Sequence, residues 1–341
     1  MTAAEGVLAA ARKLADDVLF PDAVRVDRLD VLPGAHLDAL AELGLFGAPA
    51  PGEVGGLGLD LRELSAVVEE VAGGCLATAF VWIQHFRLLM TLAAVGAPAA
   101  LRDRWLAPAC RGTLRGGIAL TGLMPGPPLL SARPVGGAWR VDGTAPWVTG
   151  WGLVDLVVVT ARGPGDTLVT LVMDAVDQPG LTVSRQRLSA VDASVTVRLG
   201  FDGVLIPEER LAGQSPFDPD ASTQPEGLRV NGSLALGVAG RCCRLLGPGP
   251  LDDELAACRE RLDKALDGDA AAMATARAAA CELAIRATAA LAVRDGSRSI
   301  MVDQPAQRLA REAVFLLVFG SRPAIKSALL HQLRATTPWV R

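Results

Sequence analysis

The feature that most constrains the fold of this chain is a central segment of β-type patterning placed between two helical regions. From Val195 to Phe201 apolar side chains alternate with polar or small ones, which is the two-residue period of a half-buried strand. Residues 155–160 contain a β-branched run, and turn signals such as Gly136-Gly137 and Pro164-Gly165 separate such runs. This succession predicts an antiparallel sheet or barrel in the middle of the chain.

Helical periodicity dominates on the amino-terminal side of this segment. Apolar residues between Leu64 and Val71 recur on one helical face, as in an amphipathic helix. Residues 37–44 repeat the pattern in a shorter element, and the proline- and glycine-rich residues 48–58 predict a loop between the two.

On the carboxyl-terminal side we expect a polar linker from Gly213 to Pro225 and then helices. A helix is expected from Leu228 to Leu246, another over the alanine-rich Ala270 to Val293, and a third from Gln307 to Phe319. The sequence therefore predicts an α+β fold with an N-terminal α-helical domain over residues 1–113, a middle antiparallel β-barrel or sheet domain over residues 114–212, and a C-terminal α-helical bundle over residues 213–341.

Composition narrows the functional classes. The net charge is -4 with both signs interspersed, so we expect no nucleic-acid partner. The six cysteines form no C-x-x-C pair and the three histidines lie far apart, so we expect neither a metal site nor a disulfide framework. The N-terminus lacks the basic start and apolar block of a secretion signal, which favours a cytoplasmic location.

The most apolar stretch, Leu76 to Val95, is long enough to suggest a membrane span. Its middle carries Gln84, His85 and Arg87, and a central arginine costs about 3 kcal/mol on insertion scales. We therefore expect a buried helix and no membrane. His85 is a possible base, but a histidine in an apolar helix is more often a hydrogen-bonded core residue.

Five segments, in this order along the chain, resemble the acyl-CoA dehydrogenase superfamily. They are the loop Pro51–Gly58, the Ala-Leu-Thr strand Gly117–Thr121, the Trp-Val-Thr segment Gly143–Thr149, the strand Phe201–Leu211 and the helix Gln307–Ala313. The resemblance covers nearly the whole chain and implies the same order of helical, β and helical regions. It also implies a flavoprotein oxidoreductase whose substrate is an acyl thioester, carried by coenzyme A or by a carrier protein, or a related biosynthetic intermediate.

FAD is the cofactor that the resemblance implies. Carried over by position, Leu120 and Thr121 face the pyrimidine side of the flavin, Trp147 flanks the ring, and Val148 and Thr149 reach its N5/O4 edge. A flavin needs hydrogen-bond donors at these edges and an apolar wall. The alternative is that Trp147 is a core aromatic of the β domain and that both threonines are ordinary strand residues.

Two departures from the family pattern concern the phosphates of FAD. Relatives extend the first C-terminal helix into a segment that holds the pyrophosphate across a subunit contact, whereas residues 247–250 read Gly-Pro-Gly-Pro here, and proline cannot continue a helix. A phosphate-contacting loop of relatives matches Arg294–Arg298, in which Gly296 is the candidate cradle. The alternative is a solvated turn that ends a helix.

The glutamate that removes a substrate proton in ordinary members has no counterpart in this sequence. By position its place is taken by Phe319, and a neutral ring cannot accept a proton. Some relatives carry the base on the first C-terminal helix, which leaves Glu226 as the only candidate, against the simpler interpretation of a solvent-facing glutamate at a helix start. The loop from Gly122 to Pro128 also lacks the serine and the acid that relatives place near the thioester carrier.

Three functions are compatible with these residues. The leading one is an FAD-dependent oxidoreductase of acyl-CoA dehydrogenase type. The second is a non-catalytic partner subunit of a heteromeric enzyme of this type, and the third is a flavin-dependent monooxygenase of the same fold. The resemblance further implies assembly as a homodimer or tetramer, or as a heteromer with a related subunit.

Overall fold

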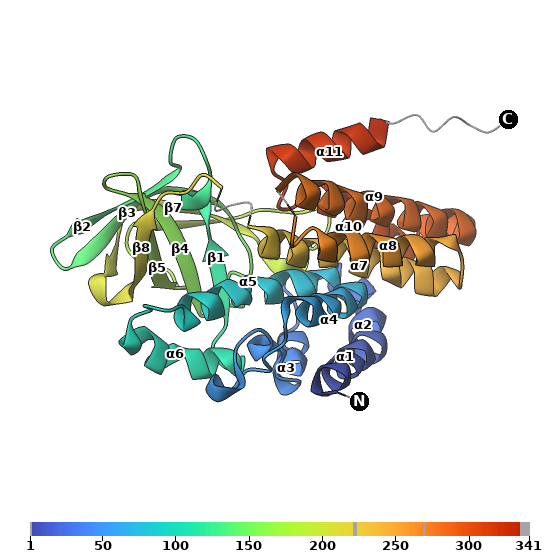
Figure 1. The fold of residues 1–341 in the computed structure, drawn as a ribbon, viewed down its shortest axis with the longest axis horizontal. Coiled ribbons are helices and arrows are strands. Elements are labelled where there is room, and N and C mark those ends of the chain that lie inside the picture. Colours follow the sequence, from blue (N-terminus) through green and yellow to red (C-terminus); the bar gives the residue numbers. More distant parts are fainter. Residues whose placement is uncertain (1, 221–223, 269, 335–341) are drawn as a thin grey trace.

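A computed structural model describes residues 2–220, 224–268 and 270–334 of the chain and shows helices, a sheet and again helices in chain order (Figure 1). The fold class expected from the sequence is confirmed. The sheet occupies the left half of the view, the C-terminal helices lie at the upper right, and the N-terminal helices lie beneath both (Figure 1).

The N-terminal helices are α1 (Ala3–Leu14), α2 (Phe20–Val26), α3 (Gly34–Glu42), α4 (Leu61–Gly74), α5 (Leu76–Ala93) and α6 (Ala99–Cys110), with a π-helical segment from Ala15 to Leu19. Three of them, α3, α4 and α5, cover the segments predicted to be helical, and the others were not predicted individually. Asp60 starts α4 with a capping box, because its carboxylate accepts from the backbone N–H of Glu63 while Glu63 accepts from the N–H of Asp60. Such reciprocal bonds satisfy two free N–H groups of the first turn.

The helix α5 is the apolar stretch that suggested a membrane span. Among the described residues it is the one helix long and apolar enough to cross a membrane, and 72% of that stretch is buried inside the protein. It contacts both the sheet and the C-terminal helices, and Figure 1 shows it running beneath both. The prediction of a buried helix is therefore confirmed.

The middle region is a mostly antiparallel sheet. Its strands are β1 (Gly116–Ala119), β2 (Leu130–Val135), β3 (Ala138–Val148), β4 (Leu156–Gly163), β5 (Thr167–Asp174), β6 (Leu181–Arg185), β7 (Val197–Pro207) and β8 (Leu211–Pro216), in the order β6-β7-β3-β2-β4-β5-β8. β1 pairs in parallel with the first half of β4, and β2 pairs with its far end at Arg162. β1 and β2 therefore share one edge of β4, which brings β1 next to β3.

The expected linker from Gly213 to Pro225 was wrong at its start. Strand β8 pairs with β5, with Gln214 opposite Val169, so the sheet extends to Pro216 and the expected boundary between residues 212 and 213 falls inside a strand. The side chains after Ala212 in this strand are exposed, because β8 is an edge strand, where polar residues and proline are tolerated. Residues 221–223 of the expected linker lie outside the described residues.

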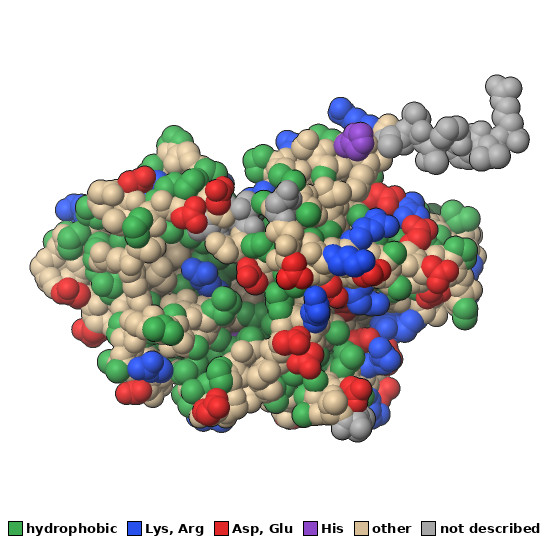
Figure 2. Space-filling model, viewed as in Figure 1, with side chains coloured by type: hydrophobic (Ala, Val, Ile, Leu, Met, Phe, Trp, Pro, Cys, Tyr) green, Lys and Arg blue, Asp and Glu red, His purple; other side chains and the backbone are tan. Residues whose placement is uncertain are grey.

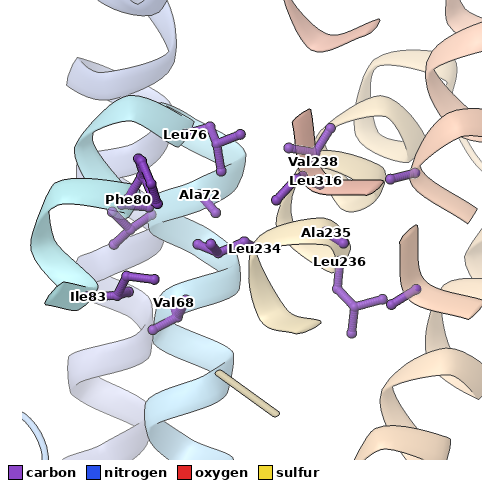
Figure 3. Packing of buried hydrophobic residues seen from close by; sticks show 14 of the residues in the cluster. Val68, Ala72, Leu76, Phe80, Ile83, Leu234, Ala235, Leu236, Val238 and Leu316 are labelled. Carbon is purple, nitrogen blue, oxygen red and sulfur yellow. The ribbon is translucent and has the colours of Figure 1, made fainter. Parts of the chain in front are cut away.

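The C-terminal helices pack against α4 and α5 to form the main core. They are α7 (Pro225–Leu246), α8 (Pro250–Lys264), α9 (Ala270–Asp295), α10 (Pro305–Val318) and α11 (Pro323–Arg334). A Cβ added to Gly237 would lie 2.4 Å from the Glu69 carbonyl oxygen, so the close approach of α7 to α4 requires glycine. Figure 3 shows Leu234 of α7 directed at Ala72 of α4, within the same apolar cluster as Phe80 of α5.

Charged side chains are unevenly distributed on the face seen in Figure 2. Red and blue groups crowd the helical half, whereas the sheet half shows mostly apolar or uncharged atoms. Among the exposed ion pairs of the helical region is Arg286 of α9 with Glu254 of α8. Pairs of this kind contribute little to stability, about 0–1 kcal/mol each.

Candidate functional site

The sheet meets α5 at two points, and these points define the candidate site. A Cβ built on Gly116, the first residue of β1, would lie 2.6 Å from Leu88 Cβ. A Cβ built on Gly150, just after β3, would lie 3.5 Å from a methyl carbon of Val81. Since both contacts fall on one helix, α5 forms the floor on which the start of β1 and the end of β3 rest.

The strands β1 and β3 are neighbours above this floor. A Cβ built on Gly117 would lie 3.4 Å from the Thr149 carbonyl oxygen, and the 3₁₀ turn Thr121–Leu123 that follows β1 also contacts β3. The two segments predicted to hold a flavin therefore form one wall. Because the strands run in opposite directions, Thr121 lies about 13 Å further along this wall than Thr149, at roughly 3.3 Å per residue.

Trp147 is not a core aromatic of the β domain, because its side chain is 62% exposed. The pairing of β3 with β7 is irregular between Ala145 and Val148, so Pro146 and Trp147 fall outside the ladder, and the Pro146 carbonyl accepts a hydrogen bond from Gln186 Nε2 at 2.5 Å. Irregularities of this kind re-aim side chains and are common beside functional sites.

The side chains of Val148 and Thr149 point into the protein. Val148 is fully buried and Thr149 is 5% exposed, and the Thr149 hydroxyl bonds the Thr196 hydroxyl at 3.1 Å, which in turn bonds Ser194 at 3.2 Å. Neither residue therefore presents its side chain to the surface of the wall. Leu120 and Thr121 are both half-buried, so they remain candidates with side chain and backbone.

Gly296 lies far from this wall. It follows α9 with a φ of +61° and has open space where a Cβ would stand, and its neighbour Arg294 donates to the carbonyl of Leu245 at the end of α7. The helix α7 has 22 residues, about 33 Å at 1.5 Å per residue, and it begins on the side of the sheet. Within one copy of the chain, Gly296 and Trp147 do not belong to the same site.

An aromatic cluster surrounds Phe319, the residue that the sequence analysis predicts in place of the catalytic glutamate. Phe319, the residue that ends α10, has its ring centroid 4.9 Å from that of Phe80 and 5.5 Å from that of Phe315. The rings of Phe80 and Phe315 are 5.1 Å apart. Edge-to-face and stacked pairs at these distances stabilise the contact between α5 and α10, and none of the three rings can take up a proton.

Two residues at this cluster, the buried Arg277 and the half-buried Phe315, were missed by the sequence analysis. Arg277 of α9 is 1% exposed and donates to the Phe319 carbonyl at 3.5 Å and to the sulfur of Cys281. Phe315 precedes Phe319 by four residues, the spacing of one helical face, and this spacing is the signal that could have predicted the aromatic pair.

Glu226 lies in the first turn of α7 and is exposed. Among the described residues no basic side chain is paired with it. One turn further along α7, Asn231 approaches the end of α10, because a Cβ built on Gly320 would lie 3.1 Å from Asn231 Nδ2. Glu226 therefore stands on the same end of α7 as the aromatic cluster, but at the surface.

His85 is a core residue, as expected. It is 1% exposed; its Nδ1 accepts from the Gly116 N–H at 3.0 Å and its Nε2 donates to the Ala109 carbonyl at 3.1 Å. Burial lowers the pKa of His85 to about 3, since a desolvated imidazolium is disfavoured. The neutral ring thus ties α6 to β1 and offers no free nitrogen for proton transfer.

Sequences and structures of known proteins resemble this chain. The N-terminal domain of acyl-CoA dehydrogenases matches residues 2–113. The benzylmalonyl-CoA dehydrogenase of Aromatoleum aromaticum is 32% identical over 236 residues, which are 67% of this chain and 62% of that protein. The mitochondrial short-chain specific acyl-CoA dehydrogenase of Bos taurus is 29% identical over 238 residues, 67% of this chain and 58% of that protein.

The structure of butyryl-CoA dehydrogenase from Megasphaera elsdenii has the same fold, with a TM-score of 0.83, 20% identity, and coverage of 97% of this chain and 98% of that one. The chain belongs to the acyl-CoA dehydrogenase superfamily. Its match spans 62% and 58% of the lengths of the two relatives by sequence. Membership in this superfamily establishes the ancestry and the fold. Because the match spans only part of these relatives, the activity of this member has to be argued from its own residues.

Proposed function

We propose that this chain is an FAD-dependent oxidoreductase of acyl-CoA dehydrogenase type that acts on an acyl thioester. The observation that supports this most is the side chain of Trp147, which is 62% exposed at the irregular end of β3. A large ring left open beside a second strand is a surface that a planar ligand can cover.

The residues around Trp147 fit the ring end of FAD. Trp147 supplies an apolar face, and its backbone lies outside the β3–β7 ladder. Pro146 has no N–H, and its carbonyl already accepts a hydrogen bond from Gln186. The backbone groups of Trp147, together with those of Leu120 and Thr121 at the end of β1, are candidates for the polar edges of the ring. When bound, FAD supplies an acceptor for a hydride from the substrate.

The phosphate end of FAD requires a second copy of the chain in this proposal. Gly296 stands about one helix length from Trp147 in the same copy, whereas the open left-handed turn at Gly296, with a φ of +61°, is a conformation that exposes backbone N–H groups to an anion. A homodimer or tetramer that brings the two together would complete the cofactor site.

Glu226 is the candidate proton acceptor of this proposal. Phe319 and its aromatic neighbours offer no base, and Glu226 is the carboxylate at the end of α7 that lies near them. For this role Glu226 has to turn inward from its exposed position when the substrate binds.

The test is titration of the purified chain with FAD, followed by visible absorbance and by quenching of flavin fluorescence. Trp147→Ala is expected to weaken FAD binding at least tenfold, because it removes the apolar face. The matched control is Leu205→Ala, since Leu205 is 57% exposed on β7 and away from β1. A wild-type protein that takes up no FAD, or a Trp147 variant that binds FAD as well as wild type, contradicts the proposal.

A second candidate function is favoured by the aromatic cluster at Phe319. A chain without a catalytic base can serve as a non-catalytic partner of a related, active subunit. Such a partner keeps either the fold together with the flavin wall or only the fold. Turnover of acyl thioesters by the chain expressed alone excludes this function, and Glu226→Gln then shows whether Glu226 carries the turnover. Activity that appears only after co-expression with a related subunit supports it.

A further inference from the structure

Arg87 of α5 is a guanidinium without a counter-ion. Its Nε is buried and has no hydrogen-bond partner, and among the described residues no carboxylate, hydroxyl or carbonyl is bonded to any of its nitrogens. The side chain as a whole is half-buried, and burial alone lowers the pKa of Arg87. A desolvated charge is costly unless something pairs with it.

Arg87 differs in this respect from the other buried arginines. Three further guanidiniums have a buried Nε without a partner, but each has a carboxylate on another nitrogen: Arg162 with Asp166, Arg185 with Asp192, and Arg308 with Glu312. Arg229 and Arg241 likewise pair with Asp263 and Asp16. Arg277 has no carboxylate, but it donates to the Phe319 carbonyl and to the sulfur of Cys281. Each of these buried arginines therefore has a partner on at least one nitrogen, whereas among the described residues Arg87 has none.

The position of Arg87 places it beside the candidate site. It shares a helical face with Phe80 and Ile83, seven and four residues earlier, and so lies about 10 Å along α5 from the aromatic cluster. The next residue, Leu88, is the one that packs against Gly116 at the start of β1. Met90, three residues after Arg87, is 60% exposed. The helical face that carries Arg87 therefore runs from the buried aromatic cluster to solvent.

We propose that Arg87 binds an anionic oxygen group, a carboxylate or a phosphate, of a ligand that lies along α5 at the edge of the candidate site. The five N–H donors of a guanidinium lie in a planar fork that matches either group in a two-pronged contact. A carboxylate would belong to the acyl part of the substrate, and a phosphate to its carrier. The inference rests on the proposed function for the location of the ligand, but the anion contact is measurable without FAD.

The experiment measures the melting temperature of the full chain against increasing sodium glutarate, sodium phosphate, or sodium chloride at equal ionic strength. The wild-type melting temperature is expected to rise with one of the two oxyanions beyond the chloride reference, because a ligand that binds only the native state stabilises it. Arg87→Gln is expected to lose this rise, Arg87→Lys to keep part of it, and Arg198→Gln, an exposed arginine on β7, to behave as wild type. A rise with glutarate assigns the acyl part, and a rise with phosphate assigns the carrier.

An equal rise in Arg87→Gln, or no rise above chloride in wild type with either anion, overturns the inference. Folding of the variant is not at risk, since without anion Arg87→Gln removes an unpaired charge and is expected to melt no lower than wild type. FAD uptake is measured on the same samples. If the Arg87→Gln variant takes up FAD and still shows the full anion effect, only the role of Arg87 is refuted. If the anion effect depends on Arg87 but the protein takes up no FAD, only the proposed function is refuted.

Discussion

His85 makes a prediction about stability that can be worked out from the structure. In the folded chain its pKa is lowered from 6.5 to about 3 by burial, and its Nδ1 must stay unprotonated to accept the bond from Gly116. In the unfolded chain the ring takes up a proton near its ordinary pKa. The contribution of the neutral His85 to the unfolding free energy is therefore fully present above pH 6.5 and decreases as the pH falls below that value.

The magnitude at pH 5 is about 2 kcal/mol of unfolding free energy lost relative to pH 7.5, at 1.36 kcal/mol per pH unit below the unfolded pKa. This figure depends on the unfolded pKa and hardly on the folded one, because at pH 5 the ring is neutral for any folded pKa well below 5. The pKa of His36 is also lowered by burial, so the contribution of His85 has to be measured as a difference between variants.

Urea unfolding of wild type and His85→Gln at pH 7.5 and pH 5 provides the measurement. At pH 7.5 the variant is expected to be less stable by about 0.5–1.5 kcal/mol, because it loses the edge-to-face contact between the imidazole and the Phe46 ring. Between the two pH values it should lose about 2 kcal/mol less than wild type. His331→Gln, at an exposed position of α11, is the control and should follow wild type. Parallel losses in wild type and His85→Gln would refute the assignment of a neutral, buried ring.

Two further predictions concern stability elsewhere in the fold. Glu312→Gln should lower the unfolding free energy by about 3–5 kcal/mol in urea unfolding, because it leaves Arg308, only 1% exposed and 2.5 Å from Glu312, as an uncompensated buried charge. The control Glu254→Gln breaks an exposed pair with Arg286 and should lower the unfolding free energy by about 1 kcal/mol or less. Equal losses in the two variants would contradict this prediction. Gly112→Ala should lower the unfolding free energy by more than about 2 kcal/mol, because the φ of Gly112 is +71° and the new Cβ would lie 2.7 Å from the Phe46 ring. The control Gly165→Ala has a similar φ of +66° with open space around the new Cβ, so it measures the cost of the backbone conformation alone.

Local patterns in the sequence predicted the elements whose environment is uniform along their length. Ala270 to Val293 was expected to be helical and is helical to Asp295, since nothing in it interrupts the backbone hydrogen bonds. The alternation that begins at Val195 predicted β7, but the strand starts at Val197. Val195 itself has a φ of +50°, a strained conformation for a β-branched residue that only the surrounding structure can impose.

The candidate site was harder to predict, because its geometry depends on contacts between distant segments. Leu120–Thr121 and Trp147–Thr149 could be assigned to one wall only through the resemblance, and the sequence did not reveal that the Thr149 hydroxyl is committed to Thr196. The contact of Phe319 with Phe80 joins residues 239 positions apart, and no local pattern encodes it. Arg87 was visible only as an argument against a membrane span, since the absence of a counter-ion is a property of the packed chain.

Two features that bear on the choice of function lie along α5. The wall of β1 and β3 holds the segments that resemble a flavin site, whereas the aromatic cluster at Phe319 contacts Phe80 of α5 and the unpaired Arg87 lies seven residues further along the same helix. Binding of FAD therefore cannot decide between an active oxidoreductase and a non-catalytic partner, because both keep the wall. The decision lies on the α5 side, where a ligand anion that pairs with Arg87 favours a substrate-binding enzyme, and a site that binds neither anion nor thioester favours the partner subunit.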